Sequence, residues 1–350
     1  MSAVRDQWAE SVEPFLAPLA DVARDFTRLT GVPVDLPTLL FLRAELAGRS
    51  LPGQTSAGGS CRLLRTADGW AAVNLARPDD TAAVPALVAL LGSPETELSD
   101  AVRRATGAEV ARNAQLLGIA AAALGPARRS RPPVRVRRPG ARRPGQPYGR
   151  GPGASRVVDL SALWAGPLCA RLLGLAGADV VKVESTTRPD GARFGSPGFY
   201  RWLHDGHESL TLDFSSGALA EVVAGADVVI EASRPRALRR LGVHAERFLA
   251  ARPGRVWVGI TGYGRDDDRI AFGDDAAVAA GLTGLGADGD PVFLGDALAD
   301  PVTGVFAAHA AARSLARGGG ELLCVSMAGC AAALVDSGVR GTAGERPRPC

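Results

Sequence analysis

In the second half of the chain, short apolar segments alternate with longer segments in which apolar residues recur at helical spacing. The short segments predict strands at 156–160, 179–184, 209–214, 227–232, 255–261 and 321–327. The longer segments predict helices at 167–176, 217–225, 244–251, 275–285 and 301–317. Because successive strands joined by a helix run parallel, this alternation predicts an α/β fold with a doubly wound, Rossmann-like, mainly parallel sheet.

The first half of the chain has a different pattern. Apolar residues at helical spacing, beginning with Trp8 and Val12, predict a helix near the N-terminus, and similar spacing predicts helices at 36–46, 85–91 and 108–124. Two alternating segments, 60–66 and 69–75, flank Ala67-Asp68 and predict a β-hairpin. Together these elements predict a smaller α+β domain that precedes the Rossmann-like domain.

A segment rich in arginine, proline and glycine separates the two halves, with nine arginines between residues 128 and 150. It has two interpretations, an extended linker between domains or a tether for nucleic acid or another acidic surface. Because it has one tyrosine and no interleaved aromatic residues, we favour the linker and expect no nucleic-acid partner. The predicted organisation is a small domain at 1–127, a linker at 128–154 and a Rossmann-like domain at 155–350.

Composition and charge narrow the class of protein. The net charge is +3, no apolar run reaches the ~18 residues that span a bilayer, and the charged N-terminus lacks the apolar core of a signal peptide. We therefore expect a cytoplasmic protein without a membrane partner. The five cysteines are scattered, which favours buried thiols over disulfides or a metal site. His204 and His207 flank a predicted turn, so a metal site is not expected there, and the single lysine, Lys182, fits a composition bias toward arginine.

The segment 156–184 predicts a β–α–β unit with a turn suited to a ligand. Its first strand is followed by Ala165-Gly166-Pro167, a turn that leads into a helix, and Gly177 ends that helix before the second strand. Parallel strands place the start of the connecting helix at the carboxyl edge of the sheet, where open α/β folds hold anionic ligands. The turn lacks the GxGxxG pattern of dinucleotide-binding proteins, so alone it indicates only a nucleotide-type site.

Acidic residues precede two of the predicted helices. Asp274 or Asp275 is expected to be the N-cap of the helix that follows. Asp300 precedes Pro301 and a long alanine-rich helix, and it has two interpretations. It is either a structural N-cap or a nucleophile for a thioester carbonyl, kept ionised by the positive end of the helix.

The segment VVDLSALWAGPLCARLLGLAGADVVKVE resembles the start of the family III CoA-transferases, which include formyl-CoA transferase and the carnitine CoA-transferases. The resemblance continues in order through SLTLDF, ADVVIEASRPRALRRLGV, RVWVGITGYG, DDAAVAAGLTG, LADPVTGVFAAHAAARSLARGGG and LLCVSM. It covers residues 155–330 with several independent blocks at the family's spacing, which makes it a specific match.

The resemblance implies an acyl-CoA:carboxylate CoA-transferase that binds CoA at the Rossmann-like domain. The family's nucleophilic aspartate falls on Asp300, which would form a mixed anhydride with the acyl group and then an aspartyl-CoA thioester. The implied partners are acyl-CoA, a carboxylic acid acceptor and a second copy of the chain in a homodimer, with no permanently bound cofactor. The implied CoA contacts are Trp164, Ala165, Ala232, Ser233, Arg234 and Arg240. Arg240 is either the partner of a CoA phosphate or a surface arginine of a helix.

The chain departs from the family pattern in its charges and in its domain order. Family members commonly carry Lys-Arg-Ser where this chain has His207-Glu208-Ser209, and many have Asn where it has Ala232. One positive charge is thereby lost and another depends on pH. The family's small domain follows the nucleophile, whereas here its resemblance lies in the segments 59–92 and 113–125. We therefore expect a rearranged, permuted-like domain order.

Two alternatives stay open. Acyl-CoA racemases of the same superfamily move an α-proton with a histidine and an aspartate, and the histidine would fall at Asp274, which disfavours that reaction. A non-catalytic CoA-binding homologue is suggested by the lost basic residues, while the retained motif around Asp300 argues against it. A covalent acyl adduct at Asp300 would separate the transferase from the non-catalytic homologue, and deuterium exchange at the α-carbon would identify a racemase.

Overall fold

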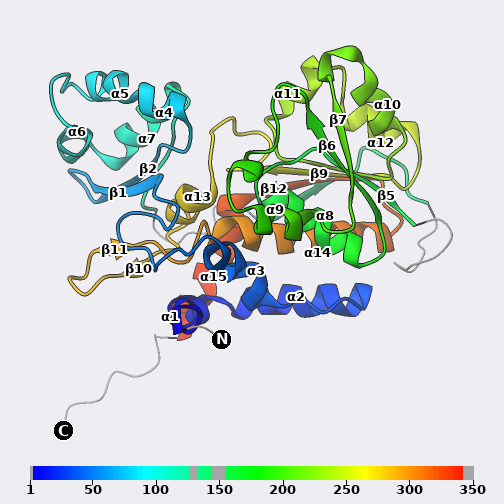
Figure 1. The fold of residues 1–350 in the computed structure, drawn as a ribbon, viewed down its shortest axis with the longest axis horizontal. Helices are drawn as coiled ribbons and strands as arrows, with labels where there is room; N and C mark the ends of the chain where they lie inside the picture. The colour runs from blue at the N-terminus through cyan, green and yellow to red at the C-terminus, as the bar shows by residue number, and fades with distance from the viewer. Residues whose placement is uncertain (1–2, 126–131, 144–153, 342–350) are drawn as a thin grey trace, which may run out of the picture.

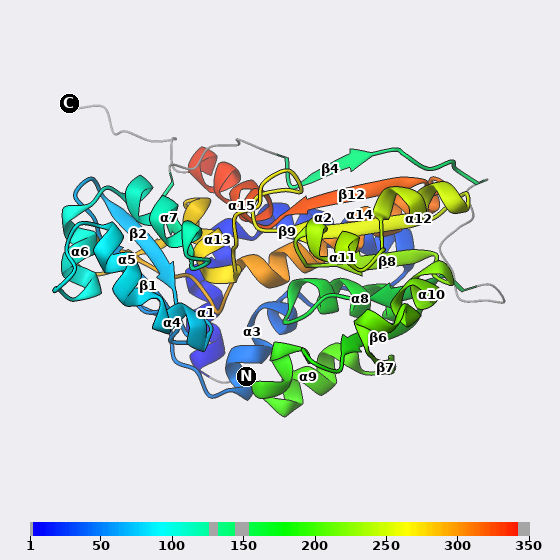
Figure 2. The same cartoon turned by 90° about the horizontal axis from the view of Figure 1, so that it is seen from above.

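The computed structural model describes residues 3–125, 132–143 and 154–341, and its centre is a seven-stranded sheet (Figure 1, Figure 2). In spatial order the strands are β4 (Val134–Arg137), β12 (Glu321–Ser326), β9 (Val256–Thr261), β8 (Val228–Glu231), β5 (Arg156–Asp159), β6 (Asp179–Ser185) and β7 (Glu208–Leu212). Only β4 runs antiparallel to its neighbour in this sheet. The predicted mainly parallel α/β fold is confirmed.

Strand β5 marks the point at which the chain changes direction across the sheet. Strands β6 and β7 are added on one side of β5, and β8, β9 and β12 on the other. Pairing of Val157 with Val228 holds β5 beside β8. Open α/β sheets bind ligands outside the carboxyl ends of their strands at such a switch point. The loops after β5 and β8 are therefore the structural candidates for a ligand site.

Successive residues of the central strands face opposite sides of the sheet, and helices cover both sides. On one side, Val157 belongs to the same core as α8 (Ala165–Leu175), α14 (Ala299–Ala316) and α15 (Met327–Gly341). On the other side, Val158 packs in a core with α10 (Ala218–Ala224) and α12 (Ala245–Ala251). Burial on both faces explains why the central strands are almost continuously apolar.

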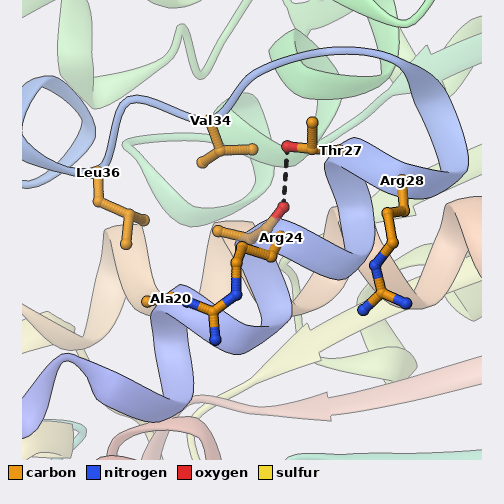
Figure 3. A pocket seen from close by; sticks show the side chains of 7 residues that line it. Ala20, Arg24, Thr27, Arg28, Val34 and Leu36 are labelled. Carbon is orange, nitrogen blue, oxygen red and sulfur yellow. Dashed lines mark hydrogen bonds between the residues drawn. The ribbon is translucent and has the colours of Figure 1, made fainter.

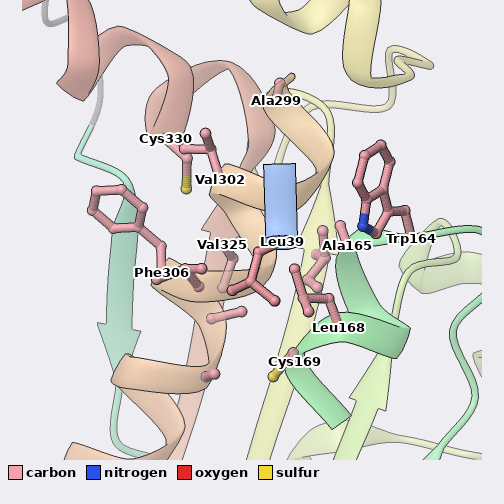
Figure 4. Close-up of a cluster of buried hydrophobic side chains, with 14 of the residues drawn as sticks. Leu39, Trp164, Ala165, Leu168, Cys169, Ala299, Val302, Phe306, Val325 and Cys330 are labelled. Carbon is pink, nitrogen blue, oxygen red and sulfur yellow. The ribbon is translucent and has the colours of Figure 1, made fainter. Parts of the chain in front are cut away.

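The N-terminal helices α1 (Ala3–Val12), α2 (Ala17–Thr30) and α3 (Leu36–Leu46) join the helical layer that contains α14 (Figure 1). Trp8, Phe26 and Phe41 are buried in the same core as α8 and α14. Figure 4 shows Leu39 of α3 among the side chains of these helices. The sequence analysis grouped α1–α3 with the small domain, but their contacts tie them to the large sheet. The division of the chain into domains remains a prediction.

The smaller α+β unit is built on a three-stranded antiparallel sheet of β1 (Cys61–Arg65), β2 (Trp70–Asn74) and β3 (Ala120–Ala123). Its helices are α4 (Pro78–Ala82), α5 (Val84–Leu90), α6 (Leu98–Arg104) and α7 (Gly107–Leu116). The predicted hairpin is confirmed as β1 and β2. The predicted helix at 108–124 is wrong in its second part, because α7 ends before Gly118, which has a left-handed φ of 79°. The following alanines pair with β2, so sheet pairing outweighs their helix propensity.

Part of the predicted linker belongs to the large sheet. Residues 134–137 form β4, which pairs with β12 at the sheet edge. Arg135 and Arg137 donate to Asp266, and Arg138 donates to the buried Glu321 at 3.2 Å. The arginines in this stretch therefore neutralise acidic groups of the chain itself. Residues 128–131 and 144–153 of the predicted linker lie outside the described residues.

The remaining elements connect these layers. They are η1 (Glu13–Phe15), η2 (Gly191–Phe194), α9 (Pro197–His204), η3 (Phe214–Ser216), α11 (Pro235–Arg240), α13 (Gly273–Ala279), β10 (Gly284–Leu285) and β11 (Pro291–Val292). Cys61, Cys169, Cys324 and Cys330 are buried free thiols as predicted, and Cys350 lies outside the described residues. Within the part of the chain that the structure describes, no helix is long and apolar enough to cross a membrane.

Candidate active site

The loops after β5 and β8 lie side by side at the carboxyl edge of the sheet. The backbone N–H of Leu160, just after β5, donates to the carbonyl of Ile230 at 2.9 Å. The first loop continues to Trp164 and Ala165, and the second to residues 232–234. The structure therefore brings most of the predicted CoA contacts to the switch point of the sheet. The predicted turn at Ala165 is the first turn of α8, which begins two residues before the predicted start at 167.

A buried ion pair network holds the loop between β5 and α8. Lys182 on β6 lies 3.0 Å from Asp190 and 3.6 Å from Asp159, and its ammonium donates to the carbonyl of Ser161. Although burial opposes its charge, Asp159 and Asp190 raise the pKa of Lys182. The lysine that the sequence analysis ascribed to composition bias is therefore a structural centre of this loop.

The same network stabilises an unusual backbone conformation next to the predicted site. Leu163 has a left-handed φ of 70°, which costs a non-glycine residue about 1–2 kcal/mol. Asp190 offsets this cost because it accepts the Leu163 N–H at 2.8 Å. The next residue, Trp164, is fully buried. Its ring packs edge-to-face against that of Phe199, with 5.1 Å between the two ring centroids. The Trp164 indole is therefore part of the core.

Asp300 lies in the first turn of α14 and is half-buried. The predicted N-cap role is wrong, because Leu298 occupies the N-cap position. Burial raises the pKa of Asp300 to about 7 and Asp274 adds to the rise, while Arg43 and the backbone N–H of Gly273 oppose it. The expectation that the helix start keeps this carboxylate ionised is therefore corrected, since burial and two neighbouring carboxylates outweigh the helix dipole.

Two further carboxylates fix the turn that leads into α14. Asp296 is fully buried and accepts hydrogen bonds from Arg43 Nε at 2.7 Å, from a second nitrogen of Arg43, and from Arg49 Nη1 at 2.6 Å. Asp274 Oδ1 accepts the Ala297 N–H at 3.0 Å, and Ala297 has a left-handed φ of 48°. Because Asp300 N–H donates to the Ala297 carbonyl at 2.8 Å, this turn determines where Asp300 lies.

Neither Asp274 nor Asp275 is the predicted N-cap of α13, because Phe272 takes that position. Both lie in the first turn of the helix. Asp275 Oδ1 accepts the Phe272 N–H at 3.0 Å and the side-chain amide of Asn74 at 3.1 Å. Burial raises the pKa of Asp274 to about 6 and that of Asp275 to about 7. The start of α13 therefore joins the small sheet to the site around Asp300.

Arg43 contacts both Asp296, in the turn before α14, and Trp164, in the loop after β5. Its guanidinium carbon lies 4.5 Å from the centroid of the Trp164 ring, while its nitrogens bind Asp296. The sequence analysis missed Arg43, Arg49 and Asp296. A signal was present for Arg43, since it interrupts the apolar helix LPTLLFLRAEL, but its partner is far away in sequence.

Helices α8 and α14 touch directly beside the site. A Cβ atom at Gly304 would lie 2.9 Å from the carbonyl oxygen of Ala165 and 2.9 Å from Leu168 Cβ, closer than real Cβ contacts. Glycine at this position therefore allows the backbone of α14 to reach α8 one turn after Asp300. Figure 4 shows side chains of both helices in the same core, Val302 from α14 and Leu168 from α8.

The remaining predicted residues lie on the second loop and on α11. Ala232 and Arg234 are exposed, Ser233 is half-buried, and its hydroxyl has no hydrogen-bond partner among the described residues. Arg240 is exposed at the last position of α11. Neither Arg234 nor Arg240 forms an ion pair with another described residue. The structure does not bring Arg240 into contact with Asp300 or its carboxylate neighbours.

His207, at one of the departures from the family pattern, supplies no charge near neutral pH. It packs against α8, where a Cβ on Gly174 would lie 3.2 Å from its Nε2 atom, and its ring centroid is 5.7 Å from that of His204. Burial lowers the pKa of both histidines, that of His204 to about 4. Both rings are therefore neutral at pH 7.

A separate hollow of about 400 Å³ lies beside α2 (Figure 3). Its walls are Ala20, Ala23, Arg24, Thr27, Arg28, Val34 and Leu36. The Thr27 hydroxyl donates to the Ala23 carbonyl at 3.0 Å within it. None of these residues contributes to the surroundings of Asp300.

Comparison with known proteins agrees with this placement of elements. The model of CoA-transferase family III matches residues 154–348, more than half of the chain. Over 121 residues the chain is 35% identical to the succinyl-CoA–L-malate CoA-transferase beta subunit of Chloroflexus aurantiacus, covering 31% of this chain and 30% of that protein. It is 32% identical over 123 residues to the succinyl-CoA:mesaconate CoA-transferase of Haloarcula hispanica, covering 31% of each. The match thus spans about a third of the length of these relatives.

A solved structure extends the likeness beyond the sequence match. The crystal structure of a CAIB/BAIF family protein from Brucella suis superposes with a TM-score of 0.50 and 26% identity. The superposition covers 59% of this chain and 60% of that chain. The family model covers six of the seven strands of the large sheet, β5 to β9 and β12, and begins after β4.

Proposed function

The chain belongs to CoA-transferase family III, and we propose that it transfers coenzyme A from an acyl-CoA to a carboxylic acid with Asp300 as the nucleophile. One observation carries the proposal: a half-buried carboxylate at the start of α14 is joined through Arg43 to the turn at Trp164. With its pKa raised to about 7, Asp300 is partly ionised at neutral pH and more basic than an ordinary carboxylate. Both properties favour attack on a thioester.

The proposed reaction exchanges one acyl bond for another at each step. Asp300 attacks the thioester carbon, the C–S bond breaks, and CoA thiolate leaves a mixed anhydride. The thiolate then attacks the aspartyl carbon, the donor acid departs as a carboxylate, and an aspartyl-CoA thioester forms. The acceptor carboxylate repeats these steps in reverse, so that the acceptor leaves as its CoA ester and Asp300 is regenerated. The Gly273 N–H, which donates to Asp300, would stabilise the oxyanion that forms on the aspartyl carbon.

We propose that CoA binds at the switch point of the sheet. The backbone at Trp164 and Ala165 would contact it from one side, and Ala232, Ser233 and Arg234 from the other. Arg234 and Arg240 are exposed, and a guanidinium matches phosphate oxygens, which supports their assignment to the CoA phosphates. Because His207 is neutral at pH 7, these arginines would carry most of the electrostatic attraction for CoA.

The relatives suggest which substrates to test first. Their names specify succinyl-CoA as donor and malate or mesaconate as acceptor. We therefore propose short dicarboxylic acids as the acceptor class and succinyl-CoA as the first donor. We further propose a homodimer, which light scattering after size exclusion would test.

Covalent trapping tests the transferase proposal. The protein is incubated with succinyl-CoA, or with short, branched and aromatic acyl-CoAs, and hydroxylamine is added. Hydroxylamine nitrogen attacks the aspartyl carbon, CoA or the donor acid leaves, and Asp300 becomes a hydroxamate that peptide mass spectrometry detects. Asp300→Asn is the control. The proposal fails if CoA binds across the panel while Asp300 stays unmodified and no CoA reaches an added acid.

Proton exchange at the α-carbon is the second candidate activity. The observation that favours it is a pair of neighbouring carboxyl groups, Asp274 and Asp300, whose pKa values are raised to about 6 and about 7. Groups of this kind can remove and return a proton near neutral pH. Against it, Asp274 Oδ1 is occupied by the Ala297 N–H. Deuterium incorporation into a 2-methylacyl-CoA without an acceptor acid would identify this activity.

A further inference from the structure

Arg43 reaches the surroundings of Asp300 from outside the part of the chain that the family model matches. It lies on α3, whereas the match begins at residue 154. Its side chain is 22% exposed and Asp296, its partner, is not exposed at all. A buried carboxylate that accepts a two-nitrogen hydrogen bond from one guanidinium fixes both the position and the orientation of that guanidinium.

This guanidinium contacts two structures next to Asp300, the turn before α14 and the start of α8. Through Asp296 it holds the turn whose carbonyl at Ala297 receives the Asp300 N–H. Through its flat face it contacts the Trp164 indole at 4.5 Å, the geometry of a cation–π pair. Trp164 in turn begins the helix that α14 contacts at Gly304.

We propose that Arg43 is a positioning residue for Asp300: from the N-terminal helix α3 it holds the turn at Asp296 against the Trp164 indole and directs its positive charge toward the Asp300 carboxylate. The inference rests on the proposed function, because it assigns Arg43 to the nucleophile of that reaction. It also gives the N-terminal segment a part in the chemistry of the matched domain.

The charges around Asp300 make this role measurable. Two carboxylates face it, Asp274 from α13 and Asp296 from the preceding turn, and both raise its pKa. Arg43 from α3 is the cation that lowers it, with help from the Gly273 N–H of α13. Without Arg43, Asp300 would keep two negative neighbours and lose the cation that lowers its pKa, so its ionisation would require a higher pH.

Arg49 offers a matched control. It donates to the same oxygen of Asp296 as Arg43, at 2.6 Å, and its side chain is 27% exposed, close to the 22% of Arg43. Its guanidinium has no contact with the Trp164 ring among the described cation–π pairs. Loss of Arg49 therefore removes one charge from Asp296 without removing the link from Asp296 to Trp164.

The experiment measures the ionisation of Asp300 without relying on catalysis. A water-soluble carbodiimide with glycine amide labels carboxyl groups in their protonated form. Peptide mass spectrometry measures the labelling of Asp300 from pH 5 to pH 9. The proteins compared are the parent chain and its full-length variants Arg43→Gln, Arg43→Lys and Arg49→Gln. We expect the labelling midpoint of Arg43→Gln to rise by about one pH unit, which lowers the ionised fraction below the midpoint about tenfold. Arg43→Lys should keep a midpoint near that of the parent, and Arg49→Gln should not move it.

Acyl trapping on the same variants separates this inference from the proposed function. If the parent chain is acylated, Arg43→Gln should lose more acylation of Asp300 at pH 6 than at pH 9. Arg43→Lys keeps the charge but not the planar guanidinium, so its acylation should fall by the same factor at pH 6 and at pH 9. If the parent chain is never acylated, the proposed function fails and a shifted labelling midpoint still supports the Arg43–Asp300 link. Equal midpoints in Arg43→Gln, Arg49→Gln and the parent overturn the inference.

Discussion

Replacement of Asp275 by asparagine should stabilise the protein, and the gain should grow with pH. Asp275 is not exposed to solvent, and its Oδ2 has no hydrogen-bond partner among the described residues. Asn74, which donates to Asp275 Oδ1 at 3.1 Å, likewise has an unpartnered Oδ1. A proton on Oδ2 would complete a pair of hydrogen bonds between the acid and the amide. Protonation of Asp275 would therefore give both buried oxygens, Asp275 Oδ2 and Asn74 Oδ1, a hydrogen-bond partner.

The magnitude follows from the raised pKa. Burial raises the pKa of Asp275 from 3.8 to about 7, so the unfolded chain ionises first and stability is lost as pH rises from 3.8 through 7. The loss amounts to about 2 kcal/mol at pH 5 and about 4 kcal/mol at pH 8, using about 1.4 kcal/mol for each pKa unit. In Asp275→Asn, an amide N–H replaces the acid proton and does not titrate. The variant should therefore gain about 2 kcal/mol more at pH 8 than at pH 5.

Urea unfolding followed by circular dichroism at pH 5, 6.5 and 8 measures this difference. Asp100→Asn, on the exposed surface of α6, is the control for loss of one formal charge. A gain that is the same at every pH would refute the account, as would a loss of stability at pH 8. Either result would mean that the fold does not raise the pKa of Asp275.

Three further predictions test other parts of the fold. Gly304→Ala should push α8 away from α14, lower the stability by about 1–3 kcal/mol in thermal unfolding and reduce acylation of Asp300 in the trapping assay. Gly53→Ala is the control, because no atom lies within 4 Å of the added Cβ, and it should change neither the stability nor the acylation. Lys182→Met should lower the free energy of unfolding by about 3–5 kcal/mol, because it leaves Asp159 and Asp190 buried without a cation. Adding Asp190→Asn to that variant should recover part of the loss, and urea unfolding that Lys182→Met leaves unchanged would contradict the role of the network. Burial lowers the pKa of His204 from 6.5 to about 4, so the unfolded chain takes up a proton first as the pH falls. The free energy of unfolding should therefore decrease by up to about 3 kcal/mol between pH 6.5 and pH 4, and His204→Phe should reduce this dependence on pH.

The periodicity of the sequence was sufficient for the large sheet. Each predicted strand from 156 to 327 has its counterpart, and the helices between them lie within a few residues of their expected bounds, the helix expected at 275–285 excepted, since α13 already ends at Ala279. These elements follow from local patterns, because a strand buried on both faces and an amphipathic helix each carry their own apolar signature. The β–α–β turn at Trp164 and the aspartate at Asp300 were likewise visible as residues.

Local patterns were insufficient where a partner distant in sequence decides the outcome. The alanines at 120–123 form a strand because β2 lies beside them, and residues 134–137 form β4 because β12 offers an edge. Helices α1–α3 resembled part of a small domain until their apolar faces were found against α14. In each case the choice depends on pairing or burial, which no single segment encodes.

The sequence by itself determined the α/β architecture and the β–α–β unit with its turn before α8, and its resemblance to a known family identified Asp300 as the candidate nucleophile. The order of the strands, and with it the switch point between β5 and β8, came from the tertiary structure. Only the tertiary structure decided the electrostatic state of that carboxylate. Arg43 and Asp296 are 253 residues apart in the chain, and Asn74 and Asp275 are 201 apart, yet each pair is joined by hydrogen bonds. Charge and burial act through space, so the pKa of Asp300 depends on neighbours that the order of residues does not reveal.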